Sequence, residues 1–539
     1  MIPILALIIL GCLAYSNCFF NFFHLDDYAF IVNNPAIRDF HHLADIWASE
    51  PTRFLTTFSF VLNYHWGGLN PVGYHIVSLL LHLATTLMFW QLMLLLTEDA
   101  WISFLGAAIF LLHPLQTQAV NYIYQRGVLF TAFFYISSLV FFIKSNRPKG
   151  QYYYVASLFC MVLSLFSKEN AVTLPVMMLL YQWIWVKPKE IKGPKIWPFF
   201  LTLFILPLVW LAPRLSHIKD FLHGTSNGIS PIIYALTQSK VILTYLKLLI
   251  IPVHQRIEYD YSLVNGFDMS VSLSLIVILG LIAIGFLIRE RFKLISFGIF
   301  WFFLTLLPES SFWPNNDVIY EHRVYLPLAG FAFFLSGLIF ALFKDKQRSM
   351  GIRILLIVLA IYGGLTYQRN KVWHDELSLW DNTVQESPKS WRAYLNRGAA
   401  YQNLGDLPHA MADYNMIIAL GRLDPIGLSN RGLIFAKWGQ FDLAMANYNL
   451  AIHIEPSYMG AYNNRGLLYA EEGQTDLALA DLNIAMQQIR DNAWLYRSRG
   501  LLYRSKGENE LAIQDFEQAQ RLIPNEPEFR ELIAETPHS

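Results

Sequence analysis

The stretch NRGLLYAEEGQTDLALADL, residues 464–482, decides the fold of the C-terminal part of this chain. An arginine and a glycine stand at its start, a second glycine follows, and a small alanine lies beyond that glycine. The same pattern returns every 34 residues on both sides of the stretch. The positions that keep this interval are Arg397, Arg431, Arg465 and Arg499, each followed by a glycine, then Gly405, Gly439, Gly473 and Gly507, and finally Ala410, Ala444, Ala478 and Ala512.

A period of 34 residues is typical of the tetratricopeptide repeat, in which each unit is a pair of antiparallel helices. The first glycine allows the helices to pack closely, the second marks the turn, and the alanine lies where the helices cross. Four units in one register therefore predict an all-α solenoid over residues 388–530. Such an array usually binds a peptide or a protein, although a spacer without a ligand is the alternative.

The N-terminal part of the chain has the composition of a membrane protein. Of the 539 residues, 55% are hydrophobic and only 15% are charged, whereas an average soluble domain has about 25% charged residues. Because about 20 apolar residues cross a bilayer, we predict a polytopic helical membrane domain over residues 1–370 and a junction over 371–387. The eleven predicted spans are 2–20, 72–96, 101–113, 127–143, 152–166, 171–186, 196–212, 271–288, 293–307, 324–343 and 351–367.

The basic loops predict how these spans are oriented, since cytoplasmic loops are enriched in lysine and arginine. Such loops begin at residues 144, 187, 289 and 344. All four loops face the cytoplasm only if the apolar run 241–252 does not cross the membrane. We therefore expect this run to form an interfacial or re-entrant helix. The C-terminal repeats then share the outer face with the loops 21–70, 213–270 and 308–322.

Charge and cysteine content exclude some classes of function. Forty basic residues balance forty acidic ones, so the chain lacks the electrostatic signature of nucleic-acid binding. Cys12, Cys18 and Cys160 all lie in apolar segments without metal-ligand spacing. They predict neither a disulfide framework nor a zinc site.

Ionisable residues beside membrane segments are costly and tend to mark function. The stretch HLDDYAFI, residues 24–31, has two such residues, Asp26 and Asp27, side by side. With the basic side chains of other outer loops they would suit a phosphate-bearing substrate: the cations would hold the phosphate, and one carboxylate would act as general base on a hydroxyl. The other candidates on this face are His113, Arg126, Lys168, Glu169, Arg256, Glu321 and Arg323.

The residues leave several alternatives open. The carboxylate pair would also suit a divalent metal such as Mg²⁺ or Mn²⁺, or Asp27 would cap the helix that follows. The remaining charges would also serve as structural ion pairs. His75 and His82 share one helix face, which fits either polar packing in the bundle or part of a metal site.

The order of the motifs resembles a known family. These motifs are DDYAFIVNNPAI (26–37), NPVGYHIVSLLLH (70–82), LLHPLQTQAVNYIYQRG (111–127), SKENAV (167–172), LLIIPVHQRIEYDYS (248–262) and EHRVYLPLAGF (321–331), followed by four tetratricopeptide units. Together they resemble the transmembrane and tetratricopeptide-repeat-containing (TMTC) proteins and their bacterial relatives, which belong to the glycosyltransferase C superfamily. Eukaryotic members of this family usually have longer repeat arrays, so the resemblance with four units is to a bacterial relative.

The resemblance implies a membrane enzyme that moves a sugar, expected to be mannose, from a polyprenyl-phosphate carrier to a protein Ser or Thr hydroxyl with inversion. It implies Asp26 as the general base with Asp27 as its partner. It implies that Arg126, Lys168 and Arg323 meet the donor phosphate, supported by Glu169, Glu321, His113 and Arg256. The repeats would bind the acceptor protein, in the periplasm of a bacterium or in the endoplasmic reticulum of a eukaryote.

Two other classes compete with this interpretation. In the first, a membrane anchor without catalytic activity carries a protein-binding scaffold. In the second, the membrane part is a transporter, for which internal repeats and broken helices at mid-membrane are expected. The membrane half has no evident internal repeat, and both Asp26 and Asp27 are present. The sequence therefore favours the transferase.

Overall fold

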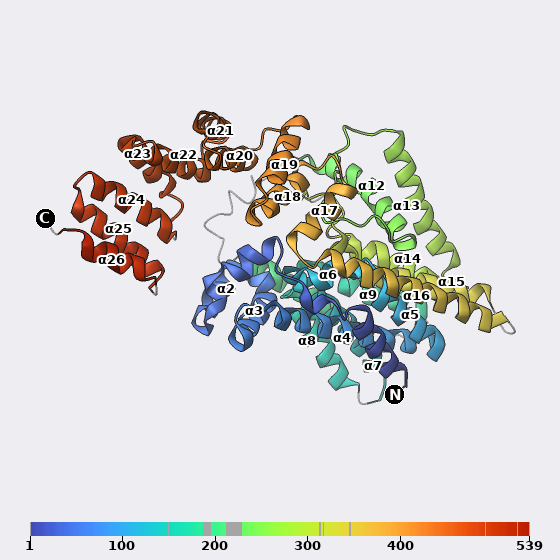
Figure 1. Ribbon diagram of the computed structural model, residues 1–539. Coiled ribbons are helices and arrows are strands. Elements are labelled where there is room, and N and C mark those ends of the chain that lie inside the picture. The colour runs from blue at the N-terminus through green and yellow to red at the C-terminus, as the bar shows by residue number, and fades with distance from the viewer. Residues whose placement is uncertain are drawn as a thin grey trace. The chain divides into compact units, whose positions relative to one another are not determined.

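The computed structural model describes residues 2–148, 150–186, 196–211, 229–311, 314–315, 317–343, 347–490, 492–524 and 526–537 (Figure 1). Within these ranges the chain contains helices and no strand, which confirms the all-α prediction. The chain forms two compact units, Met1–Asn382 and Thr383–Ser539. The predicted basic loop 187–195 and parts of the loops 213–270, 308–322 and 344–353 lie outside the described residues.

The first unit is a bundle of apolar helices with short polar connections. Its helices are α1 (Ile2–Ala14), α2 (Leu43–Ser49), α3 (Phe54–Gly67), α4 (Pro71–Thr97), α5 (Ala100–Leu112), α6 (Gln116–Asn121), α7 (Arg126–Ser145), α8 (Gln151–Leu165), α9 (Leu174–Trp185), α10 (Trp197–Leu211), α12 (Pro231–Ile250), α13 (Met269–Ile288), α14 (Lys293–Leu306), α15 (Leu328–Leu342) and α16 (Arg348–Val372). Helix α17 (Glu376–Glu386) follows and contains the boundary between the two units.

Small residues and hydroxyl groups let these apolar helices pack closely, as is common in membranes. A Cβ atom on Gly298 of α14 would lie only 2.5 Å from the carbonyl oxygen of Gly330 of α15. Helices α7 and α8 exchange hydrogen bonds instead, since the hydroxyls of Ser138 and Ser157 each donate to the other residue's carbonyl over 2.7 Å. Close packing and hydrogen bonds of this kind hold membrane helices together, because lipid tails are as apolar as the helices and provide no hydrophobic driving force for their association.

Five described helices are long and apolar enough to cross a membrane: α4, Ile123–Ser145, α12, α13 and α16. Shorter apolar helices are α1, α5, α8, α14 and α15. The expectation of an interfacial helix at 241–252 is wrong in its extent, because this run is the C-terminal half of the 20-residue helix α12. The predicted count of eleven spans and their orientation remain predictions.

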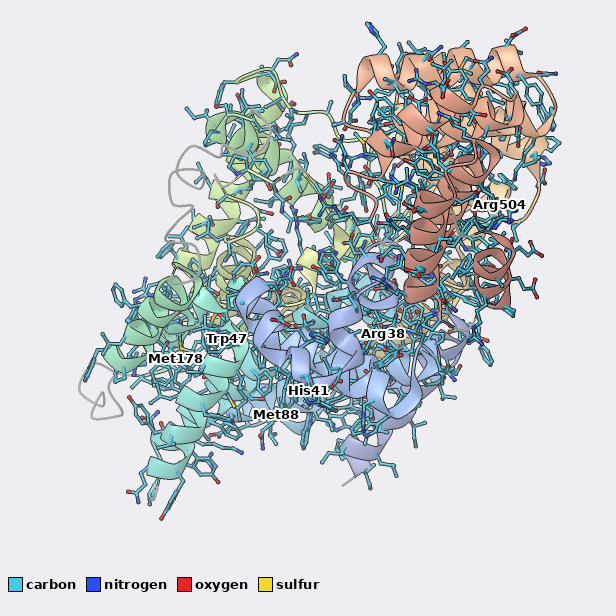
Figure 2. All side chains as sticks on the ribbon, turned by 90° about the vertical axis from the view of Figure 1, so that its left-hand side faces the viewer. Arg38, His41, Trp47, Met88, Met178 and Arg504 are labelled. Carbon is cyan, nitrogen blue, oxygen red and sulfur yellow. The ribbon has the colours of Figure 1, made fainter. Side chains whose placement is uncertain are left out.

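The first long loop, residues 21–70, is a folded cap of short helices. Phe23, Ile31, Ile46, Phe60 and Tyr74 are among the residues of a separate buried cluster that holds it together. Figure 2 labels three further side chains of this loop, Arg38, His41 and Trp47. Arg38 lies over the ring of Tyr64, and Trp47 packs against Phe54 and Phe166. A hydrophobic core of its own explains why a polar stretch beside a membrane segment adopts one structure.

The second unit is a row of helix pairs. The pairs are α18–α19 (Trp391–Asn403, Leu407–Ala419), α20–α21 (Pro425–Lys437, Phe441–Ile454), α22–α23 (Met459–Glu471, Thr475–Ala485) and α24–α25 (Ala493–Ser505, Asn509–Leu522), and α26 (Pro527–Glu535) ends the row. Gly405, Gly439, Gly473 and Gly507 lie in the turns with φ between +72° and +81°, a conformation that favours glycine. The 34-residue pattern thus records one turn per pair.

Candidate functional site

The two adjacent aspartates of the cap have different surroundings. Asp27 is fully buried, and its carboxylate accepts hydrogen bonds from the backbone N–H groups of His24 (3.0 Å) and Tyr124 (2.7 Å). Although Asp27 precedes the helical turn Tyr28–Val32, its side chain does not cap that turn. Asp26 is exposed, and its backbone N–H donates to the Tyr122 hydroxyl over 3.2 Å. Asp27 therefore ties the cap to the segment before α7 and leaves Asp26 accessible.

Burial also changes the protonation of Asp27. Loss of water raises its pKa to about 7, and the nearby Asp26 charge acts in the same direction. The hydrogen bonds from His24 and Tyr124 oppose this rise, because they stabilise the ionised form. Asp27 thus changes charge near neutral pH.

A carboxylate that the sequence analysis missed lies directly after α14. Glu309 forms a buried ion pair with Lys168, which comes from the turn between α8 and α9. Burial alone would raise the pKa of Glu309, but the positive charges of Lys168 and Arg323 lower it to about 2. An acidic residue at the end of an apolar run, in the sequence LLPESS, was the available signal.

Three cations gather around His322, close to this carboxylate. Arg323 donates to the backbone carbonyls of Asp317 (2.7 Å) and Val318 (3.2 Å). Arg53 of the cap donates to the Tyr124 hydroxyl. His322 lies within electrostatic reach of Arg53, Lys168 and Arg323, and burial together with these cations lowers its pKa well below the usual value. A neutral histidine and one carboxylate thus face three positive charges.

The cation group is continuous with the aspartates through two tyrosines. Tyr124 donates its backbone N–H to Asp27 and receives Arg53 on its hydroxyl, while Tyr122 meets Asp26. Glu169 lies near Arg53. Burial lowers the pKa of Arg53, whereas the negative charge of Glu169 raises it. The structure therefore brings Asp26, Asp27, Lys168, Glu169 and Arg323 into one region, which we call the polar site together with Arg53, His322 and Glu309.

Arg126 lies beneath the cap, among α3, α4 and α7. Its side chain is fully buried and donates to Ser59 Oγ (2.9 Å), Asn63 Oδ1 (2.7 Å) and the Tyr74 carbonyl (2.9 Å). The Phe60 ring lies 4.8 Å from the guanidinium carbon. Contact with a donor phosphate stays a prediction for Arg126, since its donors are used within the protein here.

Glu321 fastens the loop after α12. It accepts hydrogen bonds from the backbone N–H of Arg256 (2.8 Å), the Tyr259 hydroxyl (2.6 Å) and Gln255 Nε2 (3.1 Å). Loss of water raises the pKa of this carboxyl, against the opposing effects of Arg369 and these donors. Glu321 and Arg256 therefore shape the wall beside the polar site.

Three histidines of the bundle, His75, His82 and His113, each have separate protein partners. His113 Nε2 lies 3.0 Å from the Leu249 carbonyl, and His75 Nε2 lies 3.1 Å from the Asn21 carbonyl. His82 contacts the Tyr325 hydroxyl at 2.7 Å and the Leu111 carbonyl at 3.1 Å. Across the ranges that the structure describes, no three His, Cys, Asp or Glu side chains gather as metal ligands would. These contacts favour polar packing for His75 and His82.

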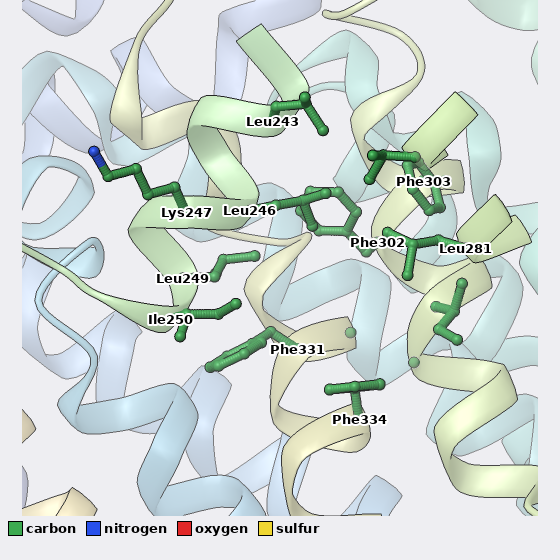
Figure 3. A pocket seen from close by; sticks show the side chains of 14 residues that line it. Leu243, Leu246, Lys247, Leu249, Ile250, Leu281, Phe302, Phe303, Phe331 and Phe334 are labelled. Atoms are coloured by element: carbon green, nitrogen blue, oxygen red, sulfur yellow. The ribbon is translucent and has the colours of Figure 1, made fainter. Parts of the chain in front are cut away.

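An apolar cavity of about 330 Å³ opens between α12, α13, α14 and α15 (Figure 3). Phe302, Phe331 and Phe334 are among the side chains that line it, and Lys247 is the charged residue on its wall. Two glycines of the close α14–α15 contact, Gly298 and Gly330, form part of its surface. The cavity has the chemistry of a hydrocarbon-binding groove.

Comparisons with known proteins cover both units. Models described as "TPR repeat" and "Tetratricopeptide repeat" match residues 432–473 and 495–526. The protein O-mannosyl-transferase F38B6.6 of Caenorhabditis elegans is 24% identical over 78% of this chain and 63% of its own length. The protein O-mannosyl-transferase Tmtc3 of Drosophila melanogaster is 22% identical over 77% of this chain and 55% of its own length.

The chain is similar to TMTC proteins and contains tetratricopeptide repeats. The resemblance drawn from the ordered motifs is thereby confirmed, while the expected bacterial origin stays an expectation. The chain spans 63% and 55% of the lengths of these two curated relatives. Among solved structures, the tetratricopeptide-repeat protein YrrB is 19% identical to this chain. The match covers 32% of this chain and 88% of YrrB, with a TM-score of 0.25.

Proposed function

We propose that this TMTC-like chain is a membrane glycosyltransferase that moves a sugar from a polyprenyl-phosphate-linked donor to a Ser or Thr hydroxyl of a protein. The observation that carries the proposal is the polar site. The exposed Asp26 lies near Tyr124, whose hydroxyl accepts a hydrogen bond from Arg53, and Arg53, Lys168 and Arg323 all lie within electrostatic reach of His322. The names of the relatives support mannose as the sugar and a protein as the acceptor.

Asp26 is the general base in this proposal. Both carboxylate oxygens of Asp27 accept backbone hydrogen bonds, so Asp27 positions its neighbour and does not take the proton. Asp26 removes the proton of the acceptor hydroxyl as the oxygen attacks the anomeric carbon. The bond from that carbon to the phosphate oxygen breaks, polyprenyl phosphate leaves, and a single displacement inverts the anomeric configuration.

The cations stabilise the negative charge that grows on the leaving phosphate. Arg323 is held by two backbone carbonyls and Lys168 by Glu309, so both charges are in place before the substrate arrives. Preorganised charges cost no rearrangement during the reaction. Arg53 completes the group from the cap side. We assign Arg126 to positioning the cap, because its guanidinium is buried and bonded to α3 and α4.

The apolar cavity between α12 and α15 suits the isoprenoid tail of the donor (Figure 3). Helix α12 connects this cavity to the polar site, because Tyr245 of the same helix donates to the Tyr320 carbonyl over 2.9 Å, three residues before Arg323. A tail in the cavity would therefore leave its phosphate near the cations. We infer that the site and the repeats face the outer or lumenal side of the membrane, the periplasm in a bacterium.

Transfer is tested with the purified chain in lipid nanodiscs, polyprenyl-phosphate mannose and Ser/Thr-containing proteins as acceptors. Wild type should mannosylate the acceptor, Asp26→Asn should lose at least about 100-fold of the rate, and Asp27→Asn should keep more activity than Asp26→Asn. Full activity of Asp26→Asn would remove Asp26 as the base. If no donor supports transfer while the repeats still capture a protein, the scaffold interpretation replaces the enzyme.

A further inference from the structure

An arginine joins the two helices in each of the four repeat pairs. In three pairs its partner is an aspartate that accepts two hydrogen bonds: Arg397–Asp413, Arg465–Asp481 and Arg499–Asp515, with Nη2–Oδ1 distances of 2.7, 2.8 and 2.6 Å. In the second pair the partner is Asn447, which accepts only Nε of Arg431, over 2.8 Å. The array thus has an amide at one position where the other three units have a carboxylate.

Among the residues that the structure describes, this difference leaves Arg431 without a carboxylate partner. The Asn447 amide N–H₂ group donates to the Leu443 carbonyl over 2.7 Å, so Asn447 serves its own helix as well. The hydrogen bonds that Arg465 and Arg499 donate to Asp481 and Asp515 raise the pKa of these arginines, whereas burial lowers the pKa of Arg431. Arginine stays protonated in proteins all the same. Within the described part of the chain, no carboxylate pairs with Arg431.

A row of exposed asparagines runs beside these arginines. Arg431, Arg465 and Arg499 donate Nη1 to the side-chain oxygens of Asn415, Asn449 and Asn483, over 3.1, 2.6 and 2.7 Å. Each bond joins one repeat to the next, and each asparagine is exposed. Because the arginine occupies the amide oxygen, the N–H₂ group of each asparagine is left to donate to a ligand.

We propose that the repeats bind an extended polypeptide along this row, and that Arg431 takes an Asp or Glu side chain of that polypeptide. A regular row of N–H donors fits the backbone carbonyls of an extended chain, and an arginine with an open Nη2 fits a carboxylate. The proposal rests on the proposed role of the repeats in binding the acceptor, and does not depend on sugar transfer. It adds a chemical class to that acceptor: an acidic residue at one defined place.

A peptide selection on the full chain in nanodiscs tests this preference. Phage-displayed random 12-residue peptides are selected in parallel on wild type, Asn447→Asp and Asp481→Asn. Asn447→Asp restores the pair found in the other repeats, and Asp481→Asn creates a second uncompensated arginine. Wild type should enrich an acidic residue at one position, Asn447→Asp should lose this enrichment, and Asp481→Asn should gain a second acidic position.

A selected peptide and its Glu→Gln version then measure the effect by fluorescence anisotropy. The Gln peptide should bind wild type about ten-fold more weakly, and the two should bind Asn447→Asp equally. Equal binding to wild type, a preference that survives Asn447→Asp, or a selection that yields no peptide would each overturn the proposal. Unchanged thermal unfolding of both variants excludes misfolding. Loss of mannose transfer alone would count against the proposed enzyme and leave this result intact.

Discussion

The carboxylate of Asp27 accepts a hydrogen bond of 2.7 Å from the backbone N–H of Tyr124, 97 residues further along the chain. Through this bond a fully buried side chain fastens the cap to the segment that leads into α7. Its neighbour Asp26 is exposed beside Tyr122. Under the proposed mechanism, the two adjacent aspartates therefore have separable tasks, one structural and one chemical.

Asp27→Asn should destabilise the protein. The asparagine amide oxygen can replace only one of the two Asp27 oxygens that accept from the backbone N–H groups of His24 and Tyr124. The amide N–H₂ group would then face the other N–H group, donor against donor. A buried donor without an acceptor costs about 1–3 kcal/mol of unfolding free energy. Thermal unfolding in detergent measures the loss. The exposed Asp26→Asn is the matched control and should unfold at the wild-type temperature; equal effects of the two variants would contradict the division of tasks.

The difference in unfolding free energy between wild type and Asp27→Asn should fall as the pH rises from about 4 to about 7. The folded-state pKa of Asp27 is about 7, above the value of about 3.9 in an unfolded chain. In this window the folded protein therefore holds more protons on Asp27 than the unfolded chain does, so raising the pH favours unfolding. Unfolding midpoints of both proteins at several pH values check this. A constant difference would mean that Asp27 does not titrate there.

Glu309→Gln should destabilise the polar site strongly. It removes the partner of the buried Lys168 and leaves Arg323 without its nearby carboxylate. Breaking a buried ion pair from one side costs about 3–5 kcal/mol. The double variant Lys168→Met/Glu309→Gln should lose less stability than the two single changes added together. Additive losses in thermal unfolding would show that the two side chains do not interact.

Gly298→Ala should loosen the α14–α15 contact. The new Cβ would lie 2.5 Å from the Gly330 carbonyl oxygen and 2.7 Å from the Phe334 nitrogen, both backbone atoms that cannot move aside alone. Overpacking of this kind costs about 1–3 kcal/mol. Gly280→Ala in α13 is the control, because a Cβ there meets nothing within 4 Å. Thermal unfolding should fall for the first variant and stay unchanged for the second.

Local patterns were enough for the helical content and for the class of protein. The 34-residue interval predicts the repeat helices because each unit folds against its neighbours in the same way. The length and apolar composition of the runs predict membrane helices. The run 241–252 was misread because the polar residues Gln238, Ser239 and Lys240 separate it from the apolar start of α12. In the structure Gln238 and Ser239 are nevertheless buried, and the Gln238 amide donates to the Val318 carbonyl.

Sequence alone thus determined the all-α class, the repeats and the presence of charged residues beside membrane segments, because these depend on spacing and composition. Only the tertiary structure decided which of those charges meet. Glu309 pairs with Lys168 across 141 residues, Arg126 is buried among α3 and α4, and Asp27 differs from Asp26 in burial and in the hydrogen bonds that its carboxylate accepts. Side-chain partners and loss of water depend on which helices pack together, and no local pattern records that.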